Sequence, residues 1–420
     1  MARQALASVS IACLLLAGGV AGQAPARSDV TFTKDILPIL QTSCQDCHRA
    51  EGSGPMPLVT YDDVRPWARA IRQRITAREM PPWFSRRDVG EYDPDPSLSD
   101  AQIAMVAAWV DNGAPRGNPA DAPPPRRFAP SGQWRFGEPD LIVTSPAVSV
   151  PAVGPDLYPE PVVDAGVTED RYVQWFEIVP EHDPVVHHVL VYDVEASAKE
   201  STENEDGARV SGTLIANLAK GGTPRFFPEG AAKIIRRGDK LRFQIHLHPN
   251  GKTSEVEHTR VGIKFFPKGY VPKHIIQTRA VSSQATLAIP PGDPNVRSDA
   301  YFTLQRPTTL LSFQPHMHYR GKRMTLEAKL PSGEVKLLSD IDRFTQRWQP
   351  TYRYKHAPVF PAGTVLHVTA YHDNSASNKL NPDPTAFVAW GERTVDEMNI
   401  GWMDFFYLTD EEFATGNASR

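Results

Sequence analysis

The chain has 420 residues and a formal net charge of −4, with charges of both signs, so electrostatics gives no reason to expect a nucleic-acid partner. This length allows two or three domains, each with its own hydrophobic core. The 39 prolines favour turns and strand edges, hence β-rich architecture over much of the chain.

The first 22 residues resemble a secretory signal peptide. Arg3 provides a positive start, residues 9–20 are apolar, and Val20-Ala21-Gly22 is a small-residue cleavage site. The apolar run is too short for a membrane span, and no later run reaches the ~18 residues that a span needs. We therefore expect a periplasmic or secreted protein without a membrane span. Cleavage would remove Cys13 and leave two cysteines, too few for a disulfide framework.

Those two cysteines, Cys44 and Cys47, form a C-x-x-C-H motif with His48. Two thiols at this spacing can form thioethers to the vinyl groups of haem, and the histidine then becomes the proximal iron ligand. The alternatives are a redox dithiol or half of a zinc site. Neither has support, because no second cysteine pair and no thioredoxin-like pattern accompany the motif. The motif predicts covalent haem c.

The surrounding residues 28–116 resemble a small class I-type cytochrome c domain. Helices are expected at 32–40, 61–78 and 101–110, and in the second of these Trp67, Ile71 and Ile75 should share one buried face.

A second axial haem ligand is expected from the loop between the last two helices. Met80 lies there in a proline-stiffened turn, and thioether ligation raises the reduction potential of haem. Met56 is too close to His48 along the chain, and Met105 fits a helix core better. Residues 117–140 then form a Pro-rich linker, interpreted as a semi-rigid spacer.

From residue 141 onward the chain has short apolar segments broken by Pro, Gly and Asp. Strands are expected at 172–178, 240–246, 261–266, 310–313 and 364–370. This pattern is typical of antiparallel sandwiches or jelly rolls. The predicted fold is multidomain: a small all-α cytochrome c domain followed by two tandem all-β jelly-roll sandwiches, at 141–280 and 281–412.

Three histidine clusters stand out in the β-rich part. His187 and His188 begin one strand, and because neighbouring strand residues face opposite sides, both can bind one metal only if the backbone is twisted or bulged there. His246 ends a second strand. His316 and His318 should point the same way, with Met317 turned from them. Each cluster alone could be structural; together they favour a metal centre.

The available ligands indicate which metal. Both mature cysteines are committed to haem, so imidazole and thioether remain, a set that favours copper. Met398, in Asp396-Glu397-Met398-Asn399, is a candidate thioether ligand.

These motifs resemble, in order, those of the copper type II, ascorbate-dependent monooxygenases (peptidylglycine α-hydroxylating and dopamine β-monooxygenase-like). The matching stretches are His187-His188, the Gln-x-His at 244–246, the His-x-His-x-x-Gly-Lys at 316–322 and the Asp-Glu-Met at 396–398. The resemblance covers roughly residues 140–410. It implies two sandwiches that face one another across a solvent-filled cleft.

The resemblance also implies a role for each ligand. An electron-transfer copper would be held by His187, His188 and His246, and an oxygen-binding, catalytic copper by His316, His318 and Met398. Together they would hydroxylate a small-molecule substrate with O2. Electrons would come from an external donor, ascorbate or a redox protein, through the haem to the first copper. The alternatives are a non-catalytic periplasmic electron-transfer or copper-binding protein, or a protein with one occupied copper site.

Some features depart from the family. The disulfides of the animal enzymes are absent, and Gln314 stands where the peptide-processing enzyme has an arginine that grips a substrate carboxylate. A peptidylglycine substrate is therefore not expected. His248 is interpreted as a turn cap rather than a spare ligand, and His372 as structural or supporting. The remaining histidines, His182, His258, His274, His356 and His367, are interpreted as surface or core residues.

Overall fold

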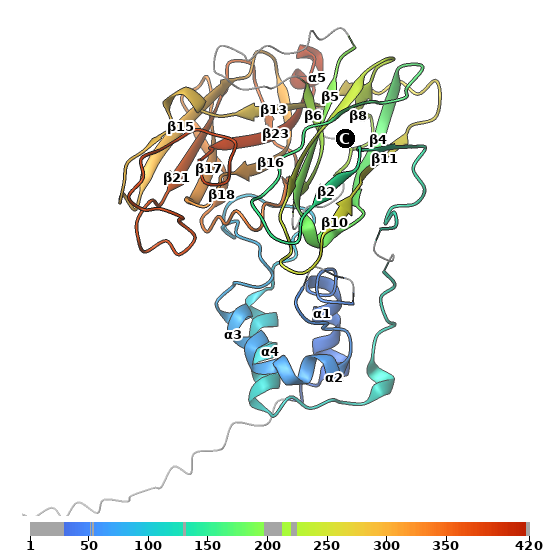
Figure 1. Cartoon of the computed structure of the whole chain (residues 1–420), viewed down its shortest axis with the longest axis vertical. Helices are drawn as coiled ribbons and strands as arrows, with labels where there is room; N and C mark the ends of the chain where they lie inside the picture. Colours follow the sequence, from blue (N-terminus) through green and yellow to red (C-terminus); the bar gives the residue numbers. More distant parts are fainter. Residues whose placement is uncertain are drawn as a thin grey trace, which may run out of the picture.

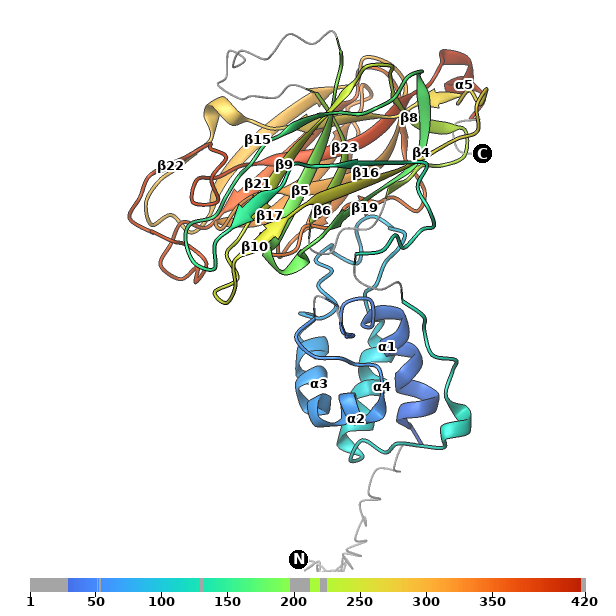
Figure 2. The same ribbon diagram turned by 45° about the vertical axis from the view of Figure 1, so that its right-hand side comes forward.

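The computed structural model describes residues 29–50, 52, 54–128, 132–196, 212–219 and 225–416. The expected signal peptide lies outside these ranges. A small helical unit stands below two β-rich units that lie side by side (Figures 1 and 2). Among the described residues, no helix is long and apolar enough to cross a membrane.

The helical unit begins with a π-helix at Phe32–Ile36 that continues into α1 (Leu37–Ser43). Three further α-helices follow: α2 (Tyr61–Val64), α3 (Ala68–Thr76) and α4 (Asp100–Asp111). Capping boxes start α2 and α4, at Thr60 and Ser99. Phe32 and Trp109 are buried at the centre of the unit's own core. The helices are short, and on their own they do not define a cytochrome c domain.

One helical expectation was wrong. The segment 61–78 is not a continuous helix, because a 3₁₀ turn at Arg65–Trp67, with Pro66 inside it, separates α2 from α3. The tighter winding of this turn changes the angular spacing of the side chains. Ile75 is buried as expected, but Trp67 is 45% exposed.

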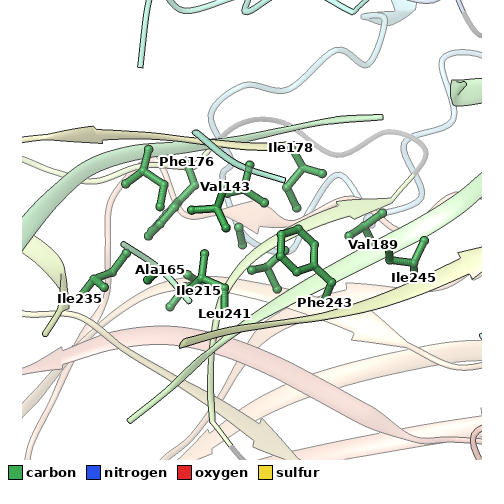
Figure 3. Close-up of a cluster of buried hydrophobic side chains, with 14 of the residues drawn as sticks. Val143, Ala165, Phe176, Ile178, Val189, Ile215, Ile235, Leu241, Phe243 and Ile245 are labelled. Carbon is green, nitrogen blue, oxygen red and sulfur yellow. The ribbon is translucent and has the colours of Figure 1, made fainter. Parts of the chain in front are cut away.

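The first β-sandwich has two main sheets. One has the order β1-β11-β4-β8-β12, with β7 paired to β4, and the other has the order β3-β9-β5-β6. Figure 3 shows the apolar side chains between them, such as Phe176 and Phe243. The strands are β1 (Leu141–Thr144), β3 (Val162–Asp164), β4 (Arg171–Pro180), β5 (Val186–Val194), β6 (Thr213–Ala219), β7 (Arg225–Phe226), β8 (Ala231–Ile235), β9 (Lys240–Leu247), β11 (Thr259–Phe265) and β12 (His274–Ile275), with the small pair β2 (Val148–Val150) and β10 (Glu255–Glu257).

The second β-sandwich also has two main sheets, β13-β23-β16-β19, with β20 paired to β16, and β15-β21-β17-β18. Its core contains Phe313, Met324 and Phe405. The strands are β13 (Gln277–Val281), β15 (Val296–Thr303), β16 (Thr308–His316), β17 (Gly321–Lys329), β18 (Val335–Ile341), β19 (Tyr352–Arg353), β20 (Val359–Phe360), β21 (Val365–His372) and β23 (Ile400–Tyr407), with the pair β14 (Ala288–Ile289) and β22 (Val388–Ala389); α5 (Asp410–Ala414) follows.

The expectation of β-sandwich architecture is confirmed, with one shift at the boundary. β13 begins at Gln277 and pairs along its whole length with β23 of the second sandwich. The second unit therefore starts slightly before residue 281.

The two sandwiches meet through the β5/β6 face of the first and the β16/β23 face of the second. Asn217 on β6 donates a hydrogen bond to Gln314 on β16 at 2.6 Å, and the rings of Tyr192 on β5 and Trp402 on β23 lie 6.5 Å apart. A further contact comes from the other sheet of the first sandwich, where buried Lys233 on β8 pairs with Asp404 on β23 at 3.4 Å.

The Pro-rich segment after α4 packs along the helical unit and is not a free spacer. Gln41 donates a hydrogen bond to the carbonyl of Pro124 at 3.0 Å, and Arg126 pairs with Asp46 at 2.8 Å. The guanidinium of Arg49 lies 4.7 Å from the ring centre of Phe128. These contacts fix the first part of the segment to the helices.

Candidate metal centre

The first histidine group forms where β5 begins beside β9. His188 lies directly opposite His246 in the antiparallel register, and the pairing shifts between Val186 and His188. This irregularity is the bulge that the sequence required, because it lets His187 turn to the same side as His188. The ligand atoms of the three histidines lie within 4.8 Å of one another.

The hydrogen bonding of this group leaves one buried ring nitrogen without a partner among the described residues. The Nδ1 atoms of His187 and His188 lie 3.1 Å apart, and buried Nδ1 of His246 has no hydrogen-bond partner in the described structure. Buried polar atoms in proteins are nearly always bonded, so an unpartnered nitrogen here calls for a ligand. Burial, followed by the neighbouring histidines, keeps the pKa of His188 well below its usual value. A neutral imidazole is the form that binds a metal.

Asp156, a residue that sequence reasoning missed, orients this group. Its carboxylate accepts hydrogen bonds from Nε2 of His246 and Nδ1 of His248, both at 2.7 Å. Bonding Nε2 of His246 fixes the ring and leaves Nδ1 available to a metal. His248 is thus an exposed supporting residue rather than a turn cap. The ring of Tyr158 stacks on His246 with 4.5 Å between centres.

The second histidine group lies where β16 ends. His316 is the last residue of β16, opposite Ile400 on β23, and His318 follows in the loop before β17. The two imidazole rings have centres 5.3 Å apart, while Met317 is fully buried in the apolar core. The alternation expected from the sequence is therefore present.

Each histidine of the second group uses one ring nitrogen for a supporting bond. Nδ1 of His316 meets Oε1 of Gln349 at 2.7 Å, and Nδ1 of His318 meets the carbonyl of Asp396 at 3.1 Å. Both bonds leave Nε2 available to a metal, and imidazole is a common ligand of first-row transition metals. Burial lowers the pKa of His316 and, with the charge of His316, lowers that of His318 to about 3.

The backbone of the Asp-Glu-Met stretch runs past His318. The Glu397 carboxylate is fully buried and accepts from the backbone N–H of His318 at 2.9 Å and of Arg320 at 2.5 Å. Met398 is half-buried, and its carbonyl meets Nε2 of His372 at 3.1 Å. His372 therefore supports this stretch.

The two histidine groups lie beside each other. The rings of His188 and His316, from different sandwiches, have centres 6.3 Å apart. This differs from the solvent-filled cleft implied by the family resemblance, because the two faces are packed together. A small pocket adjoins both groups, lined by His187, His188, Leu190, Asn217, Gln314, His316, Gln346, Arg347, Gln349 and Trp402. Its polar lining consists of four amide side chains, three imidazoles, the Arg347 guanidinium and the Trp402 indole.

The C-x-x-C-H stretch follows α1. Nδ1 of His48 meets the carbonyl of Met56 at 3.1 Å, so Nε2 is the nitrogen available to an iron. Gly54 packs against this ring, and a Cβ there would lie 2.7 Å from Nδ1. Burial raises the pKa of Cys44 to about 12. Met80 lies in the loop after α3 with 41% of its surface exposed.

Comparisons with known proteins identify no relative. No protein-family model and no curated protein matches the chain. Among solved structures, a broad bean stain virus chain is similar at 9% identity and a TM-score of 0.29, over 66% of this chain and 91% of the other. A cowpea mosaic virus chain gives 8% and 0.29, over 62% and 94%, and allantoicase gives 10% and 0.17, over 51% and 75%. Similarities this low carry no argument about function.

Proposed function

We propose that this chain is an exported copper-dependent monooxygenase that receives electrons through a covalent haem c. The observation that carries the proposal is the convergence of five buried or half-buried histidines, whose second ring nitrogens are bonded to Asp156, Gln349 and a backbone carbonyl in the three cases described above. Such bonds hold neutral imidazoles in a ligand geometry. The motif resemblance described from the sequence supports copper as the metal.

In this proposal, His187, His188 and His246 hold one copper, and His316, His318 and Met398 hold the other. When bound, copper supplies one-electron redox chemistry and, with O2, the oxidising power to hydroxylate a C–H bond. One oxygen atom enters the product and the other leaves as water, with two electrons and two protons taken from the donor. Cys44, Cys47 and His48 would hold the haem, and Met80 would supply a thioether ligand that raises its reduction potential.

The chain's own residues prepare this chemistry. Asp156 and Gln349 fix the rings of His246 and His316, and Glu397 ties the backbone of His318 to the Asp-Glu-Met stretch. The pocket between the groups offers a substrate neutral amide partners, with Arg347 as its single cationic lining residue.

The test is metal analysis followed by isotope labelling. Two coppers and one haem per chain, with oxygen from 18O2 in a hydroxylated product, support the proposal. Met398→Ala should abolish hydroxylation and leave the haem absorbance intact; full turnover in this variant would remove the assignment of the second group.

The rival function is non-catalytic electron transfer. The observation in its favour is the packing of His188 against His316, which leaves only a small pocket beside the metal groups. This rival would be favoured if the protein contained its full copper and haem but took up no oxygen on reduction in the presence of any candidate substrate.

A further inference from the structure

The helical unit docks on the second sandwich through one segment of its own chain. This docking segment, residues 83–93, lies between α3 and α4 and leaves the helices to reach the sheets (Figures 1 and 2). It forms backbone bridges between Ser85 and Ile341 and between Tyr92 and Tyr354. The family resemblance implies that the haem passes electrons to the first sandwich, whereas the docking segment contacts the second.

Hydrogen bonds fix the docking segment along its length. The N–H of Arg86 donates to the carbonyl of Asp340 at 2.9 Å, and that of Asp93 donates to Arg353 at 3.0 Å. The Arg86 guanidinium also pairs with the fully buried Asp340 carboxylate at 3.1 Å. The hydroxyl of Tyr92 donates to Ser339 at 2.9 Å. Backbone and buried side-chain bonds together make this a built interface rather than a chance contact.

An aromatic contact crosses the interface. Trp83, three residues after Met80, has its ring centre 4.6 Å from that of buried Tyr352. Tyr92 lies 5.2 Å from the same tyrosine. The expected axial ligand of the haem is thus joined by a short stretch of chain to a ring packed inside the second sandwich.

Tyr352 leads directly to the second histidine group. It lies opposite Phe313, which is three residues before His316 on β16. Three residues before Tyr352, Gln349 receives the bond from Nδ1 of His316 at 2.7 Å, and its carbonyl accepts from Gln314 at 2.9 Å. The path from Trp83 to His316 therefore consists of one ring contact, a short stretch of chain and one hydrogen bond.

We infer that Trp83 and Tyr352 carry electrons from the haem to the copper held by His316, so that electrons reach the second metal group before the first. This inference rests on the proposed function. In each transfer the haem iron goes from Fe(II) to Fe(III) and the copper from Cu(II) to Cu(I), with no bond made or broken. Figures 1 and 2 agree that α1, which precedes the haem motif, runs toward the sandwiches. His188, 6.3 Å from His316, then lies within reach of the same electron.

The test follows the haem rather than turnover. Full-length protein with Cu(II) bound and haem reduced is prepared under argon, and the loss of ferrous haem absorbance is timed by stopped flow. Trp83→Leu should slow this loss about tenfold, equal to about 1.4 kcal/mol in the apparent barrier. Phe84→Leu is the matched control, because this ring belongs to the same docking segment but lies under the guanidinium of Arg343, 5.5 Å away. Its rate should stay unchanged.

A second pair of variants tests the destination and does not depend on the docking segment. With His187→Ala the haem should still be oxidised by the remaining copper, whereas with His316→Ala the fast phase should be lost. The reverse pattern, or equal rates for Trp83→Leu and Phe84→Leu, would overturn the route. The copper and haem content of every sample is measured. A protein that takes up no copper overturns both the proposed function and the route. Full copper with a rate of haem oxidation that does not depend on Trp83 overturns the route alone.

Discussion

Replacing Asp156 by alanine should weaken metal binding at the first histidine group alone. The carboxylate holds Nε2 of His246 at 2.7 Å, and this bond leaves Nδ1 available to a metal. Without it the ring can rotate, and the lost orientation should reduce copper affinity about 10–100-fold, or about 1.4–2.8 kcal/mol. Burial opposes ionisation of Asp156, but the bonds from His246 and His248 outweigh it and lower the pKa of the carboxyl.

The assay is competition for Cu(I) against a chromophoric chelator, in a His318→Ala background that leaves the first group to report alone. His248→Ala is the matched control, since it removes the exposed partner of Asp156 and leaves the bond to His246 in place. Its affinity should change less than twofold. Equal affinities for Asp156→Ala and the parent would refute the positioning role, as would an equal loss in the control.

Three further predictions concern stability. Burial, followed by the charge of Asp239, raises the pKa of Asp193 from 3.8 to about 7. Between these pH values the folded chain holds a proton that the unfolded chain releases. The free energy of unfolding should therefore fall as the pH rises from 3.8 to about 7. Asp193→Asn should remove this slope and, above pH ~7, stabilise the first sandwich by at most about 4 kcal/mol in urea unfolding; an unchanged slope would contradict this. Asp340→Ala removes the buried acceptor of Arg323 (2.7 Å) and Arg86 (3.1 Å). It should cost about 3 kcal/mol of stability, whereas Arg86→Ala should cost less than about 1 kcal/mol. Equal losses of unfolding free energy in denaturant titrations would exclude the central role of Asp340. Gly321→Ala would place a Cβ 2.5 Å from that of Met317 and 2.8 Å from the ring of Phe344. This crowding should cost about 1–3 kcal/mol of stability and lower copper occupancy at the second group. An unaltered melting temperature with full copper would show that the loop accommodates the methyl group without strain.

Local patterns in the sequence were enough to predict the histidine groups. Period-two alternation placed His316 and His318 together with Met317 inside, and it required the bulge found between Val186 and His188. Trp67 was misplaced because one 3₁₀ turn breaks the helical period on which the prediction relied.

The supporting residues could not be predicted in this way. Asp156 lies in a loop without periodicity and meets His246 ninety positions later in the chain. Gln349 and the docking segment depend on which sheets pack together, a long-range choice that no local pattern encodes. Glu397 could have been singled out from the sequence because it is adjacent to Met398. Its role as hydrogen-bond acceptor for the backbone N–H of His318 depends on the loop conformation, which the sequence does not show.

Gln314 shows how the packing of the two sandwiches changes the interpretation of the site. From the sequence alone, Gln314 indicated that the arginine that binds a substrate carboxylate in the peptide-processing enzyme is absent here. In the structure its amide oxygen accepts from Asn217 across the sandwich interface at 2.6 Å, and its amide nitrogen donates to the carbonyl of Gln349 at 2.9 Å. An arginine has no acceptor atom and could not receive the bond from Asn217. The same residue thus joins the faces that bring His188 to His316 and holds the backbone of the residue that orients His316. We conclude that this position serves the contact between the two histidine groups.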